Sequence, residues 1–389
     1  MSRPEMPPSA PVEVRQVAGR AQRRAFLRLP WRLYRDDPLW VPPLLAAVDR
    51  TLDPRRNPFF EHGEARLLLA WSQGRPVGRI AAIVNRLHND YHGDRVGFWG
   101  FFESERDPRV AQALFAAAAH CLRAHGLTEM RGPFNPSIND ECGLLVEGFD
   151  HPPALLMPYN PPWYAELIAQ AGLQPIKELY AYRLVDQDVA SDRRTVQRLE
   201  TLARGIRRRC PQLHVRQLDM ASYARDVAAL GELFNTVRRH NWGFVPVTEA
   251  ELRAMARDMR PIVDPEIVLL AELEGRLVGC LLALPDLNPL LRKLDGRLLP
   301  LGWLRLLWGR RRARGLRLFG AGALPEHRNL GVVPLLFAQF IRNGLRRGYQ
   351  TGELSWVAED NVQSIRTIEH AVRPRLYKRY RIYARPVDR

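Results

Sequence analysis

Two stretches of this chain, 201 residues apart, carry the same pattern of residues. Leu68–Gly78 and Leu269–Gly279 both follow Leu-Leu-Ala-x-x-x-Gly-Arg-x-Val-Gly. The same offset relates two further pairs: Val14–Gln16 with Val215–Gln217, and Asn160 with Asn361. Three matches in one order at one offset indicate an internal duplication, with its boundary near residues 186–211.

Each copy of the repeat predicts a β-hairpin, because apolar β-formers flank a short turn that carries glycine. After the hairpin, both copies predict a strand, a long helix, a strand, a short helix and a last strand. The predicted ranges are 96–102, 110–125, 128–132, 162–171 and 179–184 in the first copy, and 316–322, 331–347, 352–357, 362–372 and 377–384 in the second. Strands and helices in this order indicate a mixed α/β sheet in each copy, an α+β architecture.

A length of 389 residues exceeds what one compact core usually serves, which also favours two domains. We expect a disordered, proline-rich tail, an N-terminal domain with one insertion, a linker, and a C-terminal domain with another insertion. The expected ranges, in that order, are 1–11, 12–186 with insertion 134–159, 187–211, and 212–389 with insertion 286–315.

The net charge is +16, and it comes almost entirely from arginine, which favours anionic partners without choosing among them. The four cysteines lie far apart and lack metal or redox spacing, so we expect reduced thiols and no metal. No run of about 18 apolar residues occurs, and the first residues do not resemble a signal peptide. We therefore expect a cytoplasmic protein, with peripheral attachment to the inner membrane as an option.

The turn after the predicted strand 316–322 has the features of an anion site. It runs from Leu324 to Val333 and leads directly into the predicted long helix. The first N–H groups of a helix have no partner within the helix, and together with the helix dipole they attract phosphate. Gly331 would let a ligand approach the backbone closely, and Arg328 adds a positive charge. The equivalent turn of the first copy, 103–108, is acidic and lacks glycine, which disfavours a phosphate there.

This turn resembles the acyl-CoA signature of the Gcn5-related N-acetyltransferase (GNAT) superfamily, Gln/Arg-x-x-Gly-x-Gly/Ala. The matching residues are Arg328, Asn329, Leu330, Gly331 and Val332, whereas Val333 departs from the small residue usual there. The start of the last helix at Asn361 and the strand around Tyr377 also look like a GNAT carboxyl end. The resemblance covers residues 212–386 well and 12–186 more faintly. It implies two tandem GNAT-like domains, each with a mixed, mostly antiparallel sheet flanked by helices, and acyl-CoA as co-substrate of the second.

The resemblance also implies where the chemistry takes place. In GNAT proteins a backbone amide between the two central strands holds the thioester oxygen, and here it would lie near Ala323 or Leu324. The usual tyrosine of the last helix is replaced by Ile368, so Tyr377 becomes a candidate acid, although a tyrosine of a sheet with an outward hydroxyl is the plainer interpretation.

Candidate bases follow from the need to deprotonate an amine. In the second copy they are Glu353, Glu359 and Asp360. The first insertion adds Asp140 and Glu141 among apolar residues, where burial would raise a carboxyl pKa. That role requires the insertion to reach the cleft between the copies. The alternative is a solvated turn in which these side chains cap the backbone.

The second insertion combines apolar residues with arginines. Leucines and two tryptophans over 298–308 precede clustered arginines over 310–314. Such a segment suits the boundary of an anionic bilayer, which makes 298–314 a candidate for peripheral membrane association. A lid over an apolar channel and a helix packed on the sheet are the alternatives. Nucleic acid is unlikely as a partner, because no aromatic platform or reading helix accompanies the arginines.

Further stretches at 38–44, 132–150 and 157–164 look like a bacterial family of double-GNAT proteins, some of which resemble the bacterial ceramide synthase type. That resemblance implies an N-acyltransferase acting on a primary amine, with a long-chain sphingoid base at the membrane surface as the acceptor. Two alternatives stay open: a GNAT enzyme with a small soluble amine as acceptor, and a module that binds or senses acyl-CoA without catalysis.

Overall fold

The structure is a computed structural model that describes residues 11–185 and 193–388. The expected tail 1–11 therefore lies outside the described residues except for Pro11. In the N-terminal half the elements are β1 (Glu13–Gln16), α1 (Gly19–Leu33), α2 (Leu45–Thr51), η1 (Pro58–Glu61), β2 (Gly63–Ser72), β3 (Arg75–Asn85), α3 (Arg86–His92), β4 (Val96–Ser104), α4 (Pro108–Arg123), β5 (Glu129–Gly132), β6 (Phe134–Asn135), β7 (Glu141–Cys142), β8 (Leu144–Glu147), α5 (Tyr164–Gln170) and β9 (Gln174–Val185).

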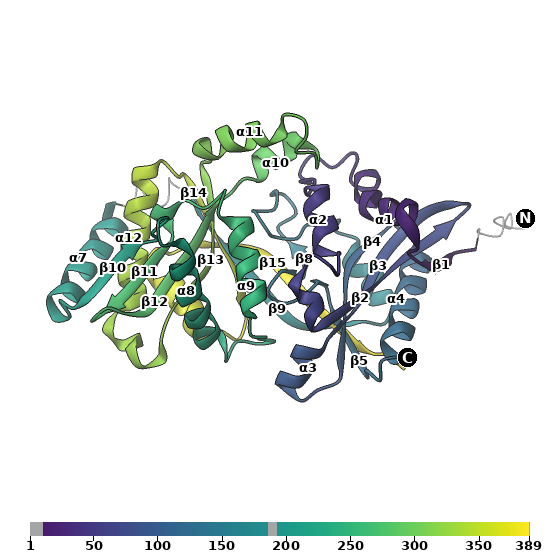
Figure 1. Cartoon of the computed structure of the whole chain (residues 1–389), viewed down its shortest axis with the longest axis horizontal. Coiled ribbons are helices and arrows are strands. Elements are labelled where there is room, and N and C mark those ends of the chain that lie inside the picture. The colour runs from purple at the N-terminus through teal and green to yellow at the C-terminus, as the bar shows by residue number, and fades with distance from the viewer. Residues whose placement is uncertain (1–10, 186–192, 389) are drawn as a thin grey trace, which may run out of the picture.

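The C-terminal half repeats this order with different insertions (Figure 1). Its elements are α7 (Arg193–Arg209), β10 (Leu213–Gln217), α8 (Tyr223–Arg238), α9 (Glu249–Met259), η2 (Pro265–Ile267), β11 (Leu269–Leu273), β12 (Arg276–Pro285), α10 (Asn288–Leu294), α11 (Gly302–Gly309), η3 (Arg310–Arg312), β13 (Gly315–Ala323), η4 (Pro325–Leu330), α12 (Val332–Arg347), β14 (Thr351–Ala358), α13 (Val362–Val372) and β15 (Arg375–Pro386). The predicted order of strands and helices is confirmed in both copies.

The two repeated motifs form equivalent hairpins. Gln73 and Gly74 have φ angles of 50° and 73°, and Glu274 and Gly275 have φ angles of 51° and 79°. Two successive residues with positive φ form the type I′ turn that matches the twist of a two-residue hairpin. The duplication read from the sequence is therefore a duplication of structure as well.

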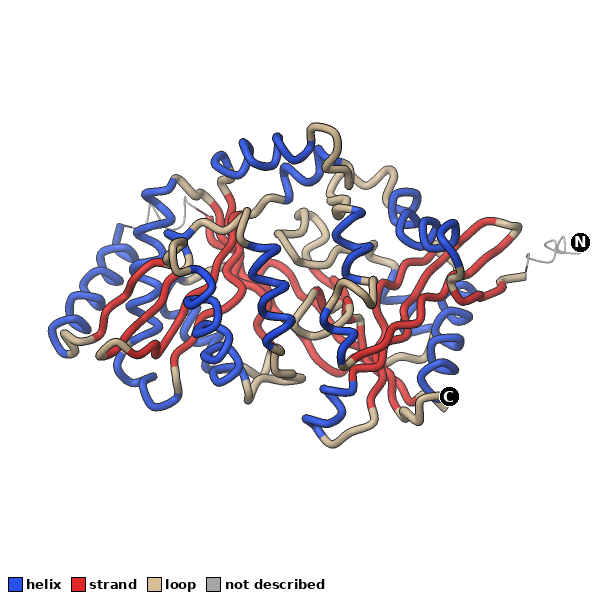
Figure 2. Tube along the Cα trace, viewed as in Figure 1, coloured by secondary structure: helices blue, strands red, loops and turns tan. Residues whose placement is uncertain are grey.

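Most of the described strands form one sheet that passes through both halves (Figure 2), and β6 and β7 pair with each other in a separate small sheet. The large sheet has thirteen strands, in the order β1-β2-β3-β4-β5-β15-β9-β14-β13-β12-β11-β10, with β8 paired to β15 beside this path. Only β4–β5 and β13–β14 pair in parallel, so the sheet is mixed and mostly antiparallel, as expected.

The two halves exchange their last strands at the centre of this sheet. β9, from the first half, pairs with β14 of the second. β15, at the end of the chain, pairs with β9 and also with β5 of the first half. Neither set of strands is complete without a strand from the other half.

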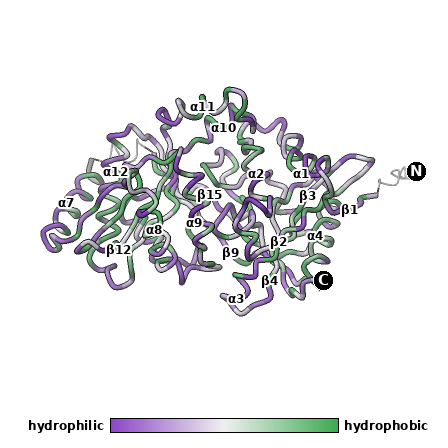
Figure 3. Tube along the Cα trace, viewed as in Figure 1, coloured by the Kyte–Doolittle hydropathy of each residue, from purple (hydrophilic) through white to green (hydrophobic). Residues whose placement is uncertain are grey.

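Helices cover both faces of the sheet. In the second half α12 lies on one face, where Leu335, Leu336 and Phe340 join the apolar core, and α8 lies on the other, with α9 packed against α8. In the first half α4 and α5 cover the first face and α1 the second. Figure 3 shows the apolar residues gathered along the strands and the helices packed on them.

The segment expected as a linker, 187–211, contributes to a core instead. Its described part contains α7, which packs against α12 and buries Leu199, Ala203 and Ile206. The arginines of 204–209 belong to the solvent face of this helix, and the three apolar residues, at helical spacing, form its buried face.

Candidate active site

The central strands of the second half diverge part of the way along their length. β13 and β14 pair from Gly315–Leu318 with Thr351–Leu354 and no further. Beyond that point β14 continues against β9, after an irregularity in register that follows Leu354. Residues 319–322 of β13 are partly exposed; 320–322 are paired only with β12, and Phe319 lies at an irregularity in that register. The two central strands therefore separate here, and we call the place where they separate the splay.

The predicted anion cradle lies at the end of the strand that borders the splay. β13 leads into η4, whose residues are exposed except for the half-buried His327, and η4 leads into α12. Gly331 has a φ of 79°, and an added Cβ would meet Ile206 of α7 at 2.8 Å. No side chain caps the start of α12. Its first N–H groups are therefore available to an anion, and only glycine fits the turn.

In the cradle, backbone N–H groups are available to an anion more than side chains are. Val332 is fully buried, and Val333 is half-buried against the same core. Arg328 and Asn329 are exposed, and Arg328 donates to the Gln363 side chain at 3.2 Å. Leu330 is exposed as well. Arg328 is therefore the side chain of this turn best placed to meet an incoming phosphate.

One of the two proposed thioester donors is already occupied. The Leu324 N–H donates to the Val278 carbonyl at 2.9 Å, so this amide faces β12. Successive N–H groups of a strand point to opposite edges. The Ala323 N–H therefore points toward the side of the splay. The expectation for Leu324 was wrong because the sequence does not reveal which edge each amide faces.

Asn361 acts first as a helix cap. Its side-chain oxygen accepts from the Ser364 N–H at 3.1 Å, and its side-chain nitrogen lies 3.4 Å from the oxygen of Asn241. This position fixes the start of α13 beside the loop that follows α8 and gives no direct sign of a ligand.

The corresponding gap in the first half is filled. β4 and β5 also pair over only three residues, 96–98 with 129–131. Past that point the Phe101 N–H donates to the Asn135 side chain at 2.7 Å, and a Cβ on Gly100 would lie 1.7 Å from the Phe134 carbonyl. The next helix, α4, is capped by the side chain of Asp107. An occupied gap and a carboxylate at the helix start leave no cradle here, which fits the expectation from the acidic turn.

A buried polar cluster lies under the splay, on the face of the sheet opposite α12. Arg317 of β13 and Glu353 of β14 are neighbours in the parallel register, and both are buried. The Glu353 carboxylate accepts hydrogen bonds from the hydroxyls of Ser355 and of Tyr377 in β15. Burial, followed by the charge of Glu353, raises the pKa of Tyr377 far above its usual value. The phenol therefore stays protonated beside a carboxylate.

The first insertion reaches this cluster. Arg317 donates to the carbonyls of Leu155 and Leu156 at 2.8 and 2.9 Å. Burial raises the pKa of Glu141, and the positive charge of Arg317 opposes that rise. Asn139 donates to the Val245 carbonyl of the second half at 3.0 Å. The insertion thus contacts the second half where the two halves meet.

Asp140 is oriented differently from Glu141. Its carboxylate accepts from the Ser137 hydroxyl at 2.8 Å, in the manner of a turn cap. Burial of its carboxylate raises the pKa of Asp140 to about 7, and the hydrogen bonds from Ser137 oppose that rise. The residue as a whole is exposed. The hydrogen bonds from Ser137 and the exposure of the residue favour the capping interpretation for Asp140.

Sequence reasoning did not single out three members of this region. Arg317 is the one charged residue in an otherwise apolar strand, and that contrast was a usable signal. Ser355 hydrogen-bonds both Arg317 and Glu353. Lys378 is fully buried, donates to the Pro152 carbonyl at 2.6 Å, and has its pKa lowered to about 8 by burial. Nothing in the local sequence indicates the last two, because their partners are far away along the chain.

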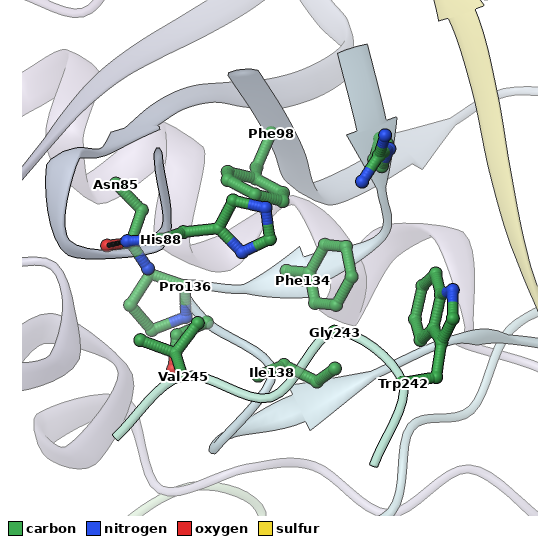
Figure 4. Close-up of a pocket in the computed structure, with 11 residues that line it drawn as sticks. Asn85, His88, Phe98, Phe134, Pro136, Ile138, Trp242, Gly243 and Val245 are labelled. Atoms are coloured by element: carbon green, nitrogen blue, oxygen red, sulfur yellow. Dashed lines mark hydrogen bonds between the residues drawn. The ribbon is translucent and has the colours of Figure 1, made fainter. Parts of the chain in front are cut away.

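The first half has a hollow at the position that matches this cluster (Figure 4). Phe98 and Arg131 occupy the paired strand positions that Arg317 and Glu353 hold in the second half. The hollow measures about 340 Å³, counting space shared with solvent. Its lining includes Asn85, His88, Phe98, Arg131, Phe134, Pro136, Ser137, Ile138, Trp242, Gly243 and Val245. Each half therefore covers the central face of the other with a loop: 242–245 here, and 152–156 over the cluster.

Two searches of the described residues concern metals and membranes. Across 11–185 and 193–388, no three His, Cys, Asp or Glu side chains gather as they would around a metal ion. Over the same ranges, no helix has both the length and the apolar composition needed to span a bilayer.

Comparison with known proteins identifies relatives over nearly the whole chain. No established family model matches. The bacterial ceramide synthase of Caulobacter vibrioides is 36% identical over 385 residues, which cover 96% of this chain and 97% of that protein. Protein YghO of Escherichia coli is 32% identical over 381 residues, covering 96% and 95%.

Solved structures agree on the fold. A tandem GNAT protein from the clavulanic acid biosynthesis pathway superposes with a TM-score of 0.56 at 16% identity, covering 97% of this chain and 99% of that one. An Enterococcus faecalis protein described as a probable N-acyltransferase gives 0.51 at 11% identity, over 97% and 73%. The chain therefore belongs to the family of the bacterial ceramide synthase, has the tandem GNAT fold, and is an acyl-CoA-dependent N-acyltransferase.

Proposed function

We propose that this protein transfers a long-chain acyl group from acyl-CoA to the primary amine of a long-chain sphingoid base at the membrane surface. The observation that carries the proposal is the match to the bacterial ceramide synthase, which extends through both halves and both insertions. The apolar cluster beside the splay supports a long-chain substrate. It includes Phe319 of β13, Leu155 of the first insertion and Leu306 of the second.

Acyl-CoA would lie in the splay of the second half. The pyrophosphate would meet the first N–H groups of α12 and the side chain of Arg328, and the thioester oxygen would accept from the Ala323 N–H. This arrangement uses the gap that stays open in the second half and is filled in the first.

The buried cluster supplies candidate groups for proton transfer. Glu353 would accept the proton of the amine as its nitrogen attacks the thioester carbon. As the C–N bond forms and the C–S bond breaks, Tyr377 would protonate the CoA thiolate. The Tyr377–Glu353 hydrogen bond lets the proton on Glu353 return to the phenol, so the products are an amide and free CoA and the enzyme is reset. Glu141 would keep Arg317 in place from the other half.

The test is thiol release from palmitoyl-CoA or acetyl-CoA, each with and without dihydrosphingosine. Release from palmitoyl-CoA that needs the lipid base, together with a ceramide product seen by mass spectrometry, is the expected result. Equal turnover with small soluble amines would overturn the choice of acceptor, and CoA binding without turnover on any amine would overturn the enzyme.

Arg328→Glu is expected to weaken acyl-CoA binding about tenfold to a hundredfold, because it replaces a charge-assisted contact with repulsion of a phosphate. Isothermal titration with CoA measures the effect. Arg342→Glu, an exposed position of α12 that pairs with Glu200, is the matched control, since it makes the same change in charge away from the cradle. Unchanged affinity in Arg328→Glu would remove the cradle from the proposal.

A further inference from the structure

The second insertion gathers an unusual share of the exposed apolar surface. Ten large hydrophobic side chains are exposed among the described residues, and four of them lie between residues 299 and 308. They are Leu299 and Trp308, which are 79% and 75% exposed, and Leu301 and Trp303. Exposed tryptophans and leucines this close together mark a surface that meets something apolar.

Positive charge surrounds these side chains. Residues 296–325 contain Arg297, Arg305, Arg310, Arg311, Arg312, Arg314 and Arg317, and no aspartate or glutamate. All of these arginines except the buried Arg317 belong to the insertion. Figure 3 shows hydrophobic and hydrophilic stretches side by side along it. Tryptophan with arginine and without acidic residues is the composition of a segment that lies at the headgroup level of an anionic bilayer.

The insertion is a fixed arch across both halves. In Figure 1, α10 and α11 lie over the region where the halves meet. On the first half, Arg292 donates to the Pro38 carbonyl at 2.9 Å and Trp31 donates to Asp295 at 2.8 Å. On the second half, Leu290 and Leu306 pack against the buried Leu284 and Leu287. We call residues 288–314 the arch. Both ends are held, so its exposed side chains form a defined surface.

The inner side of the arch connects to the reaction site. Leu306 and Leu290 share one apolar cluster with Phe319, on the edge of β13 that borders the splay, and with Leu155, beside Arg317. The same short element therefore presents tryptophans to the outside and leucines toward the place where acyl transfer is proposed. A lipid chain that leaves a bilayer at the arch would meet apolar side chains as far as the splay.

We propose that the arch is the element that docks this protein onto an anionic phospholipid bilayer, with Trp303 and Trp308 in the interface and the arginines on the headgroups. This inference rests on the membrane location proposed above and names the surface and the lipid charge. A second copy of the chain is a poor occupant, because it would bring the same arginines face to face. Each arginine near the surface strengthens attraction to anionic lipid, whereas a zwitterionic bilayer offers only the apolar contribution.

Sedimentation with vesicles tests membrane docking without substrate or turnover. A failed acyltransferase assay therefore does not contradict docking by the arch, and a failure to bind vesicles does not contradict acyl transfer. Wild type is expected to bind vesicles that contain phosphatidylglycerol at least about a hundredfold more tightly than pure phosphatidylcholine. Trp303→Ala with Trp308→Ala should reduce that binding about tenfold. Arg305, Arg311 and Arg312 are exposed, and changing all three to glutamate should reduce it at least about a hundredfold.

The matched control changes three exposed arginines of α7 to glutamate: Arg204, Arg208 and Arg209. This variant has the same net charge as the triple variant of the arch and should keep most of the vesicle binding. Equal losses in the two triple variants would mean attraction by total charge and would overturn the arch as the docking element. Vesicle binding that changes neither with the tryptophan substitutions nor with the charge of the lipid would also overturn the arch as the docking element.

Discussion

Replacing Glu353 with glutamine is expected to lower kcat about 10²- to 10⁴-fold while the affinity for CoA stays close to that of wild type. Glu353 lies one residue before the point where β13 and β14 separate, and it is the carboxylate that both Ser355 and Tyr377 contact. Glutamine keeps the size and much of the hydrogen bonding of this side chain but cannot accept a proton. The loss should therefore fall on the chemical step.

The matched control is Glu359→Gln on the same stretch of chain. Glu359 is exposed, accepts from the Glu178 N–H at 3.2 Å and lies 3.7 Å from Lys177, so its contacts are structural. Single-turnover rates and CoA titrations of both variants separate chemistry from binding. If Glu359→Gln lowers the rate of the chemical step and Glu353→Gln does not, the base is the exposed Glu359 and not the buried Glu353.

A stability measurement must accompany this comparison, because the negative charge of Glu353 also acts on the buried Arg317, its neighbour in register, and both side chains hydrogen-bond Ser355. Removing one partner of a buried pair leaves a charge without compensation and destabilises the fold by about 3–5 kcal/mol. Glu353→Asp keeps a carboxylate, and partial recovery of kcat in that variant would show that the group acts as a base as well as a counter-ion.

The elements, and the strand–turn–helix connection that carries the proposed anion cradle, could be predicted from the sequence because they depend on local features. Two glycine turns at one offset, a glycine at a helix start and the alternation of strands with helices are each visible within a few residues. The N–H of Leu324 could not be assigned, because its direction depends on the register of β13 against β12. Only pairing in three dimensions fixes that register.

The cluster around Glu353 was predictable only in part. A carboxylate and a tyrosine could be named as candidates, but their contact joins β14 to β15 across the intervening β9. The exchange of last strands was hidden for a related reason. The pattern of 377–384 indicates a strand, and that pattern is equally satisfied by a neighbour from either half. Sequence periodicity shows which face of a strand is apolar, and it does not identify the strand next to it.

The exchange of strands has a large expected consequence: neither repeat should fold when it is produced alone as residues 12–186 or 212–389. The first fragment ends its sheet at β5 without β15, and the second lacks β9 between β14 and β15. Each fragment would leave a long strand edge of unpaired backbone groups, which favours aggregation. The second fragment also loses α7, whose Leu199, Ala203 and Ile206 are buried against α12.

The size of the effect follows from what β15 buries. Lys378, Tyr380 and Ile382 are each fully buried, and burial of one large apolar side chain contributes about 1.5–3 kcal/mol. Two such side chains and the lost backbone pairing amount to roughly the whole net stability of a domain, about 5–15 kcal/mol. We therefore expect the separate fragments to be insoluble or to melt without a cooperative transition.

The matched control keeps every residue and breaks only the chain. Two polypeptides, 1–188 and 189–389, should assemble into a 1:1 complex when they are produced together, because β9 and β15 can still cross between the halves. Size-exclusion chromatography and circular dichroism would show a folded complex from co-expression and no folded species from either polypeptide alone. A cooperative melt of 212–389 by itself would mean that the second half is an independent domain, and that β9 adds to a sheet already complete.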